Sequence, residues 1–130
     1  MAEQRNRYLG GRPWLQLGFK TVDGRVHLLK LVADTGSAAG IILRPDWFFT
    51  LRHEGSPTRE SNFGPMASGW MRVYTPEIGL VEFVRGYGSD RAAEIAARSD
   101  PEFVGLVGLP VLRLTEYGGD YDTFWVRTPS

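Results

Sequence analysis

Apolar residues recur along this chain in short runs separated by glycine, proline and polar breaks, a pattern typical of β-strands. Residues 13–19 alternate between apolar and polar side chains, and residues 26–33 form a longer apolar run. The Asp-Gly pair between them, at 23–24, is a strong signal for a hairpin turn. Shorter apolar runs at 41–43 and 123–126 predict further strands. Together these patterns predict an all-β fold.

Two segments depart from the strand pattern. Residues 89–99 are rich in alanine, can be capped by Ser89 or Asp90, and stop before Pro101, so they predict the one helix of the fold. The aromatic segment 45–51 fits either a short helical turn or a covering loop.

The length of 130 residues suits one globular domain with its own core, which we expect over residues 13–130. Residues 1–12 are polar, end in Gly10-Gly11, and are expected to form a flexible N-terminal segment. This segment lacks the apolar core of a signal peptide, so a cytoplasmic location is expected.

One apolar run ends in an unusual way. Residues 28–33 lead directly into Asp34-Thr35-Gly36-Ser37, and the apolar residues 41–43 follow. A carboxylate at the end of a buried strand is costly unless hydrogen-bond donors reach it. The two hydroxyls and the glycine predict a tight loop that points donors at Asp34. The alternative is an Asp-Gly type turn between two hairpin strands, in which Asp34 bonds its own backbone.

A second motif follows at residues 104–112, where Val104-Gly105-Leu106-Val107-Gly108 precedes a short apolar stretch that can form a helical turn. In this order, the two motifs resemble the single-domain, retropepsin-like aspartic proteases. The resemblance spans about residues 13–127, although only the two motifs are specific. It implies a partly closed barrel with a flap hairpin and one helix. It also implies that the second motif threads beside the Asp34 loop.

The resemblance also implies a role for each motif residue. Asp34 would be the catalytic acid and base. Thr35 would brace the two loops across a dimer, Gly36 would offer its backbone to the substrate, and Ser37 would hydrogen-bond the outer oxygen of Asp34. The pair Val107-Gly108 would support the loop from behind.

Aspartic proteases work with two carboxyls that share a proton, and this chain has a single Asp-Thr-Gly. The sequence Asp122-Thr123-Phe124 lacks the glycine and does not count as a second copy. A homodimer with Asp34 facing Asp34 on its two-fold axis would supply the pair. Ala38 and Leu109 stand where retroviral members carry an acidic residue and an arginine, so the dimer must be held differently.

Two aromatic-rich stretches, around residues 14–15 and 124–126, are candidates for the subunit contact, because an unpaired apolar edge strand invites another chain. The alternative is that these side chains fill the core of their own subunit.

The segment between residues 61 and 84 predicts a long hairpin whose tip holds glycine, proline and apolar residues. By resemblance it is the flap that closes over the substrate; the alternative is a plain surface hairpin with a loose turn. The residues expected in the flap or substrate pocket are apolar and predict substrates with large hydrophobic side chains beside the cut: Ile41, Ile42, Phe63, Met66 and Trp70.

Composition and motifs argue against other classes of function. Fifteen basic residues balance fifteen acidic ones, and no apolar stretch could span a bilayer, so neither nucleic acid nor membrane is an expected partner. There is no cysteine, and His27 and His53 lack the spacing of metal ligands. Neither a Gly-x-Ser-x-Gly motif nor a phosphate-binding loop occurs in the sequence. We therefore expect no metal and no cofactor.

The sequence thus predicts an aspartic endopeptidase that acts as a homodimer on a peptide or protein substrate. The alternative is a catalytically silent retropepsin-like module that dimerises or binds peptides.

Overall fold

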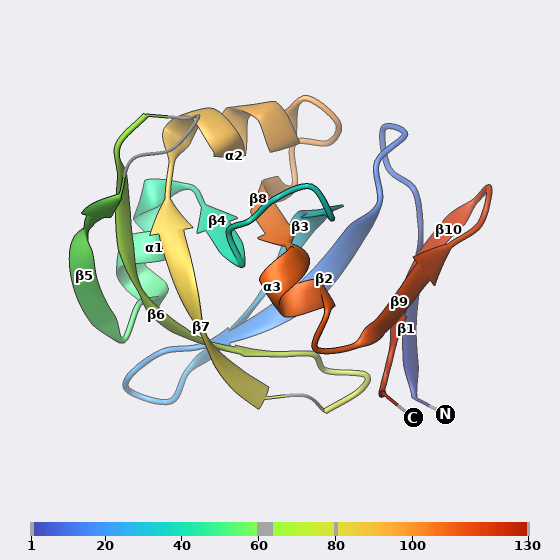
Figure 1. Cartoon of the computed structure of the whole chain (residues 1–130), viewed down its shortest axis with the longest axis horizontal. Helices are drawn as coiled ribbons and strands as arrows, with labels where there is room; N and C mark the ends of the chain where they lie inside the picture. The colour runs from blue at the N-terminus through green and yellow to red at the C-terminus, as the bar shows by residue number, and fades with distance from the viewer. Residues whose placement is uncertain (1, 60–63, 80, 130) are drawn as a thin grey trace.

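The computed structural model describes residues 2–59, 64–79 and 81–129 and shows a mostly β chain built around a closed six-stranded barrel. Neighbouring strands pair all the way around, because β2 pairs with β3 on one side and β6 on the other (Figure 1). In order around the barrel, the strands are β2 (Trp14–Lys20), β3 (Val26–Asp34), β8 (Phe103–Gly108), β4 (Ile41–Leu43), β7 (Val81–Gly88) and β6 (Met66–Tyr74).

The predicted hairpin between β2 and β3 is confirmed. Its turn contains Gly24 at a φ of 89°, a backbone conformation that glycine adopts without steric cost. The strand β5 (Glu54–Arg59) pairs with β6 and extends the sheet beyond the barrel.

Three helices of the described residues lie against the barrel, where the sequence predicted one. Helix α1 (Pro45–Leu51) takes the helical option predicted for its segment, and α2 (Asp90–Ala97) is the predicted alanine-rich helix. The Ser89 hydroxyl caps α2 by accepting a hydrogen bond from the backbone N–H of Ala92 at 3.2 Å. The short α3 (Leu109–Leu112) follows β8 directly. Within the described residues, no helix is long and apolar enough to cross a bilayer.

The two ends of the chain form a separate three-stranded sheet. In it β10 (Thr123–Arg127) lies between β1 (Glu3–Arg7) and β9 (Glu116–Gly119). The expectation of a flexible segment over residues 1–12 is therefore wrong for β1. Gln4 is buried, and its side chain both donates to and accepts from the backbone of Gln16 on β2. These bonds fasten a polar strand that has no apolar pattern of its own.

The same sheet corrects the predicted subunit contact. Strand β10 already has a strand on each side. Strand β2 pairs with β3 along its length and with β6 at Gly18–Lys20, and side chains of β1 bond its backbone at Trp14 and Gln16, so neither strand is an open edge. Leu15, Phe124 and Val126 are buried in the chain's own core, which was the alternative.

Strand alternation divides the core into two parts. On β3, Leu31 and Ala33 point into the barrel, whereas Val32 points to the outer face. There Val32 packs in a second cluster with Ala92 and Ala96 of α2. Helix α2 therefore covers the outer face of β3, β8 and β4, as Figure 1 shows above the barrel.

Candidate active site

Asp34 is the last residue of β3 and is half-buried. Strand β8 lies between β3 and β4; it runs parallel to β3 and antiparallel to β4, with Gly108 opposite Asp34. Because β3 and β4 do not pair with each other, this loop does not join two strands of a hairpin, and that part of the alternative is wrong. The second sequence motif does lie beside the Asp34 loop, as its resemblance implied.

The loop after β3 directs one backbone donor at the carboxylate, a contact that both interpretations of this loop predicted. The backbone N–H of Gly36 donates to Asp34 Oδ1 at 3.0 Å, and the N–H of Ser37 donates to the Asp34 carbonyl at 3.1 Å. A Cβ on Gly36 would lie 3.3 Å from Asp34 Oδ1, so a residue without a side chain suits this close turn. Thr35 is exposed beside it.

The structure corrects the implied role of Ser37. Its hydroxyl donates to the carbonyl of Ala39 at 3.1 Å and accepts from the Ala39 N–H at 3.3 Å, so it shapes the loop and does not bond the outer oxygen of Asp34.

Gly108 supports this loop from below. Its N–H donates to the Gly40 carbonyl at 2.8 Å, and the next N–H, of Leu109, donates to the Ser37 carbonyl at 3.1 Å. A Cβ on Gly108 would lie only 1.9 Å from the Ala39 carbonyl oxygen, a distance that no side chain could tolerate. Val107 is fully buried in the barrel. The pair Val107-Gly108 thus occupies the predicted supporting position.

Three of the expected pocket residues are core residues instead. Ile41 is fully buried, and Ile42 and Met66 are 2% and 4% exposed. Ile41 points into the barrel, whereas Ile42 and Met66 pack in the cluster beneath α2. The expected substrate pocket is therefore wrong for these three side chains, because a helix and a strand already cover them.

The hairpin predicted as the flap, between residues 61 and 84, has different bounds in the structure. Strand β6 starts at Met66 and pairs with β5 on one side and β7 on the other, so Met66–Trp70, predicted at the tip, lie within a strand. Trp70 lies on β6 and is 38% exposed. Phe63 lies outside the described residues.

The sequence analysis did not identify Arg85, which lies beside Trp70. Arg85 on β7 lies opposite Trp70, and its guanidinium carbon is 4.9 Å from the centroid of that ring. The alternation of side chains along β7 is the one sequence signal that could have placed Arg85 on the outer face.

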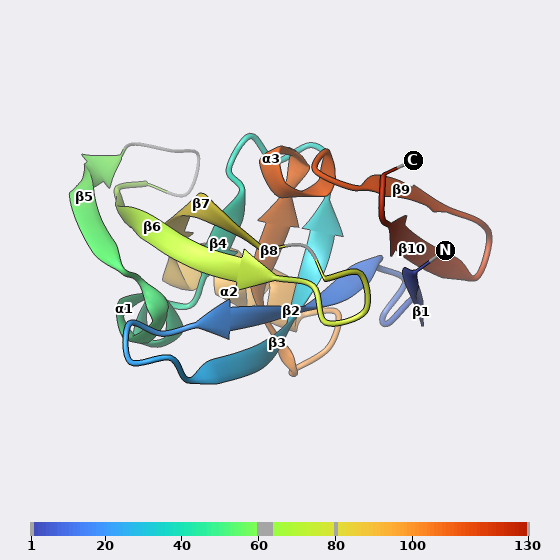
Figure 2. The same ribbon diagram turned by 90° about the horizontal axis from the view of Figure 1, so that it is seen from below.

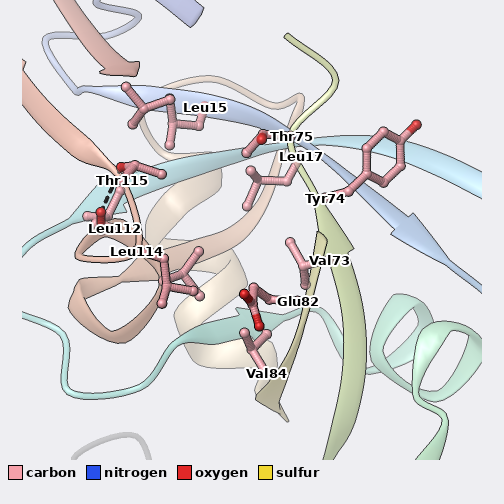
Figure 3. A pocket seen from close by; sticks show the side chains of 12 residues that line it. Leu15, Leu17, Val73, Tyr74, Thr75, Glu82, Val84, Leu112, Leu114 and Thr115 are labelled. Carbon is pink, nitrogen blue, oxygen red and sulfur yellow. Dashed lines mark hydrogen bonds between the residues drawn. The ribbon is translucent and has the colours of Figure 1, made fainter. Parts of the chain in front are cut away.

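A small apolar cavity lies elsewhere in the barrel, between β2, the β6–β7 hairpin and the segment after α3 (Figure 3). At about 10 Å³ it has room for at most one water molecule. Asp34 does not line it. The lining residues are Leu15, Leu17, Val73, Tyr74, Thr75, Glu82, Val84, Val111, Leu112, Leu114, Thr115 and Val126.

The loop after β3, helix α3 and strand β9 face the same side of the molecule, which is the upper edge of Figure 2. The described residues contain no group of three or more His, Asp or Glu side chains that could hold a metal ion.

No family model, curated protein or solved structure matches this chain.

Proposed function

We propose that this chain is a retropepsin-like aspartic endopeptidase that acts as a homodimer. One observation carries the proposal: a Gly-ending strand, β8, lies between the strand that ends in Asp34 and the strand that follows it. This arrangement holds the Asp34 loop on a rigid support while leaving the carboxylate half-exposed. A simple turn would need no such support.

Two Asp34 carboxyls, one from each subunit, would share a proton because two close carboxylates cannot both ionise easily. The ionised carboxyl takes a proton from a water molecule, whose oxygen attacks the peptide carbonyl carbon. The protonated carboxyl donates its proton to the carbonyl oxygen. Collapse of the tetrahedral intermediate then breaks the C–N bond. The first carboxyl gives the nitrogen the proton that it took from water, and the second carboxylate recovers a proton from a hydroxyl of the intermediate, which leaves a carboxylic acid and an amine.

We assign the subunit contact to an outer strand of the terminal sheet. In the terminal sheet β9 is an outer strand, and it lies on the same side as the Asp34 loop (Figure 2). The other outer strand, β1, is fastened to β2 by its Gln4 and Asn6 side chains. A two-fold axis on this side would pair β9 with its copy and bring the two Asp34 loops together.

Hydrogen-bond alternation indicates which β9 amides are available for that pairing. The N–H of Asp120 donates to the Thr123 carbonyl, so Gly118, two residues back, bonds to β10. The intervening amides of Tyr117 and Gly119 then point away from β10, toward the proposed partner.

The test compares wild-type protein with Asp34→Asn in the digestion of a peptide library at acidic and neutral pH. Wild-type protein should cleave, and Asp34→Asn should lose at least a thousandfold in rate while keeping its fold, because the change is isosteric and removes only the titrating group. Asp122→Asn, at an exposed Asp-Thr in the β9–β10 turn, is the matched control and should keep full activity.

Cleavage by purified Asp34→Asn would remove Asp34 from the catalytic role. Retention of library peptides by wild-type protein without any cleavage would instead support the silent peptide-binding module.

A further inference from the structure

Asp34 and Arg85 stand on the same face of the barrel and in the same row across its strands. On the outer face of the barrel, Val32 on β3 and Tyr87 on β7 pack in the same hydrophobic cluster. Asp34 is two residues beyond Val32, and Arg85 is two residues before Tyr87. Side chains two apart on a strand share a face, so both charged side chains lie on the outer face, next to this cluster.

Two glycines separate these charged residues within the row. Asp34 is opposite Gly108, whose N–H donates to the Gly40 carbonyl, and the β4–β7 register continues from Gly40 to Arg85. A Cβ on Gly40 would lie 3.4 Å from the Arg85 carbonyl oxygen, which shows how close β7 comes to the Asp34 loop. Other residues fill the space beside these glycines, since Ser37 and Ala39 lie over Gly108 and Val111 lies against Gly40. A peptide that reaches from Asp34 to Arg85 must therefore pass over this loop.

The guanidinium of Arg85 is incompletely paired. Its Nη1 is buried and has no hydrogen-bond partner among the described residues. None of the ion pairs in the described part of the chain includes it. The Trp70 ring, 4.9 Å away, holds the guanidinium plane by a cation–π contact without neutralising its charge. A buried donor without an acceptor is unfavourable, and a carboxylate is the acceptor that best fits the guanidinium fork.

We propose that Arg85 determines specificity by binding an acidic side chain of the peptide substrate, a proposal that rests on the function proposed above. Three strand spacings separate Asp34 from Arg85, roughly 14 Å between their backbones. An extended peptide advances by about 3.3 Å per residue, and the two side chains together bridge several ångströms. The acidic residue therefore falls about two to four residues from the bond that is cut.

The test uses peptides that the wild-type protein cleaves, each made with either glutamate or glutamine at one of these positions. Wild-type kcat/KM should be at least tenfold higher for the glutamate peptide at one position. In Arg85→Gln this ratio should fall to about one, mostly through KM, while the glutamine peptide is still cleaved. Arg85→Lys keeps the charge and should retain part of the preference.

Arg72→Gln is the matched control, because Arg72 lies over the Phe83 ring at 5.9 Å, in the next cross-strand pair on the same face of the same two strands. It should leave the glutamate preference unchanged. A wild-type preference for glutamate that survives in Arg85→Gln, or no such preference in wild-type protein, would overturn the proposal for Arg85.

Failure of the protease function gives a different result, since wild-type protein would then cleave no peptide at all. In that case the same peptides are tested for binding to wild-type protein and to Arg85→Gln. Tighter binding of glutamate peptides that is lost in Arg85→Gln would still support the Arg85 site, and equal binding of both peptides would overturn it.

Discussion

At the scale of single residues, Gly108 connects the fold to the site. Its backbone N–H holds the Asp34 loop, and its missing side chain lets that loop lie directly over β8. The nearest loop atom to a Cβ at this position would be a backbone oxygen, which cannot move aside as a flexible side chain can. The position therefore tolerates glycine alone.

Gly108→Ala should destabilise the protein by roughly 1–3 kcal/mol or more, the usual cost of overpacking a core. It should also displace the Asp34 loop, so activity should fall by more than the loss of folded protein explains. Thermal unfolding and the activity per folded molecule measure the two effects. Ala38→Ser, at an exposed position of the same loop, serves as control and should change neither. Wild-type stability in the Gly108→Ala variant would contradict the close contact.

The sequence predicted some residues of the site and missed others, for physical reasons. Asp34 and Gly108 could be identified because a carboxylate and a glycine interrupt apolar runs. Ile42 and Met66 could not be assigned correctly, since an apolar side chain suits a pocket and a core equally well. Packing of α2 decides between the two, and that packing depends on contacts between distant segments.

At the scale of elements, periodicity predicted the strands with an apolar face and the capped helix α2. It missed β1, whose sequence Glu-Gln-Arg-Asn-Arg has no apolar position. This strand is held by long-range partners: the Gln4 side chain on β2 and the pairing with β10. The position of β8 between β3 and β4 is also long-range, and only the resemblance to a family suggested it.

The terminal sheet carries two acidic residues whose environments predict sensitivity to acid. Hydrogen bonds from the Arg5 and then the Arg127 side chain lower the pKa of Glu3. Hydrogen bonds from the backbone N–H groups of Thr123 and then Asp122 lower the pKa of Asp120. A carboxyl with a lowered pKa in the folded state stabilises that state above its ordinary pKa. This contribution is lost as the pH falls through the lowered value.

Protection of the β10 amides from hydrogen exchange should therefore decrease below about pH 4, where such carboxyls begin to protonate, before the barrel strands lose protection. Glu3→Gln should produce weaker protection already at neutral pH. Asp46→Asn is the control, because the Arg44 side chain lowers the pKa of Asp46 at a site outside this sheet. Equal acid sensitivity of β10 in wild-type and Glu3→Gln proteins would show that Glu3 does not hold the sheet.

At the scale of the whole molecule, the proposed dimer has to fit the barrel, the terminal sheet and the site. The Asp34 loop and β9 face the same side, whereas α2 covers a different face of the barrel (Figures 1 and 2). A two-fold contact at the shared side leaves α2 and the Arg85–Trp70 pair outside the β9 contact. The dimer proposal and the proposed acidic specificity are therefore compatible with one another.

The proposed homodimer predicts how activity depends on protein concentration and on mixing with an inactive variant. Each chain holds one Asp34, so activity per chain should fall on dilution as dimers dissociate. Mixing with an equal amount of Asp34→Asn should reduce the activity per wild-type chain to about half, because half of the wild-type chains then sit in inactive mixed dimers. Both effects follow from a site that two chains complete together.

The proposed β9 contact between subunits can be tested at one amide. Tyr117→Pro removes a β9 N–H that points away from β10, so it should weaken the dimer at least tenfold while leaving the terminal sheet paired. Sedimentation should show monomers at concentrations where the wild-type protein is dimeric, and concentrating the variant should restore activity. Tyr121→Ala, at a turn residue that is 94% exposed, is the control and should dimerise normally. A wild-type protein that sediments as a monomer at every concentration, with constant activity per chain, would rule out the paired Asp34 mechanism and require a second acid from within the chain.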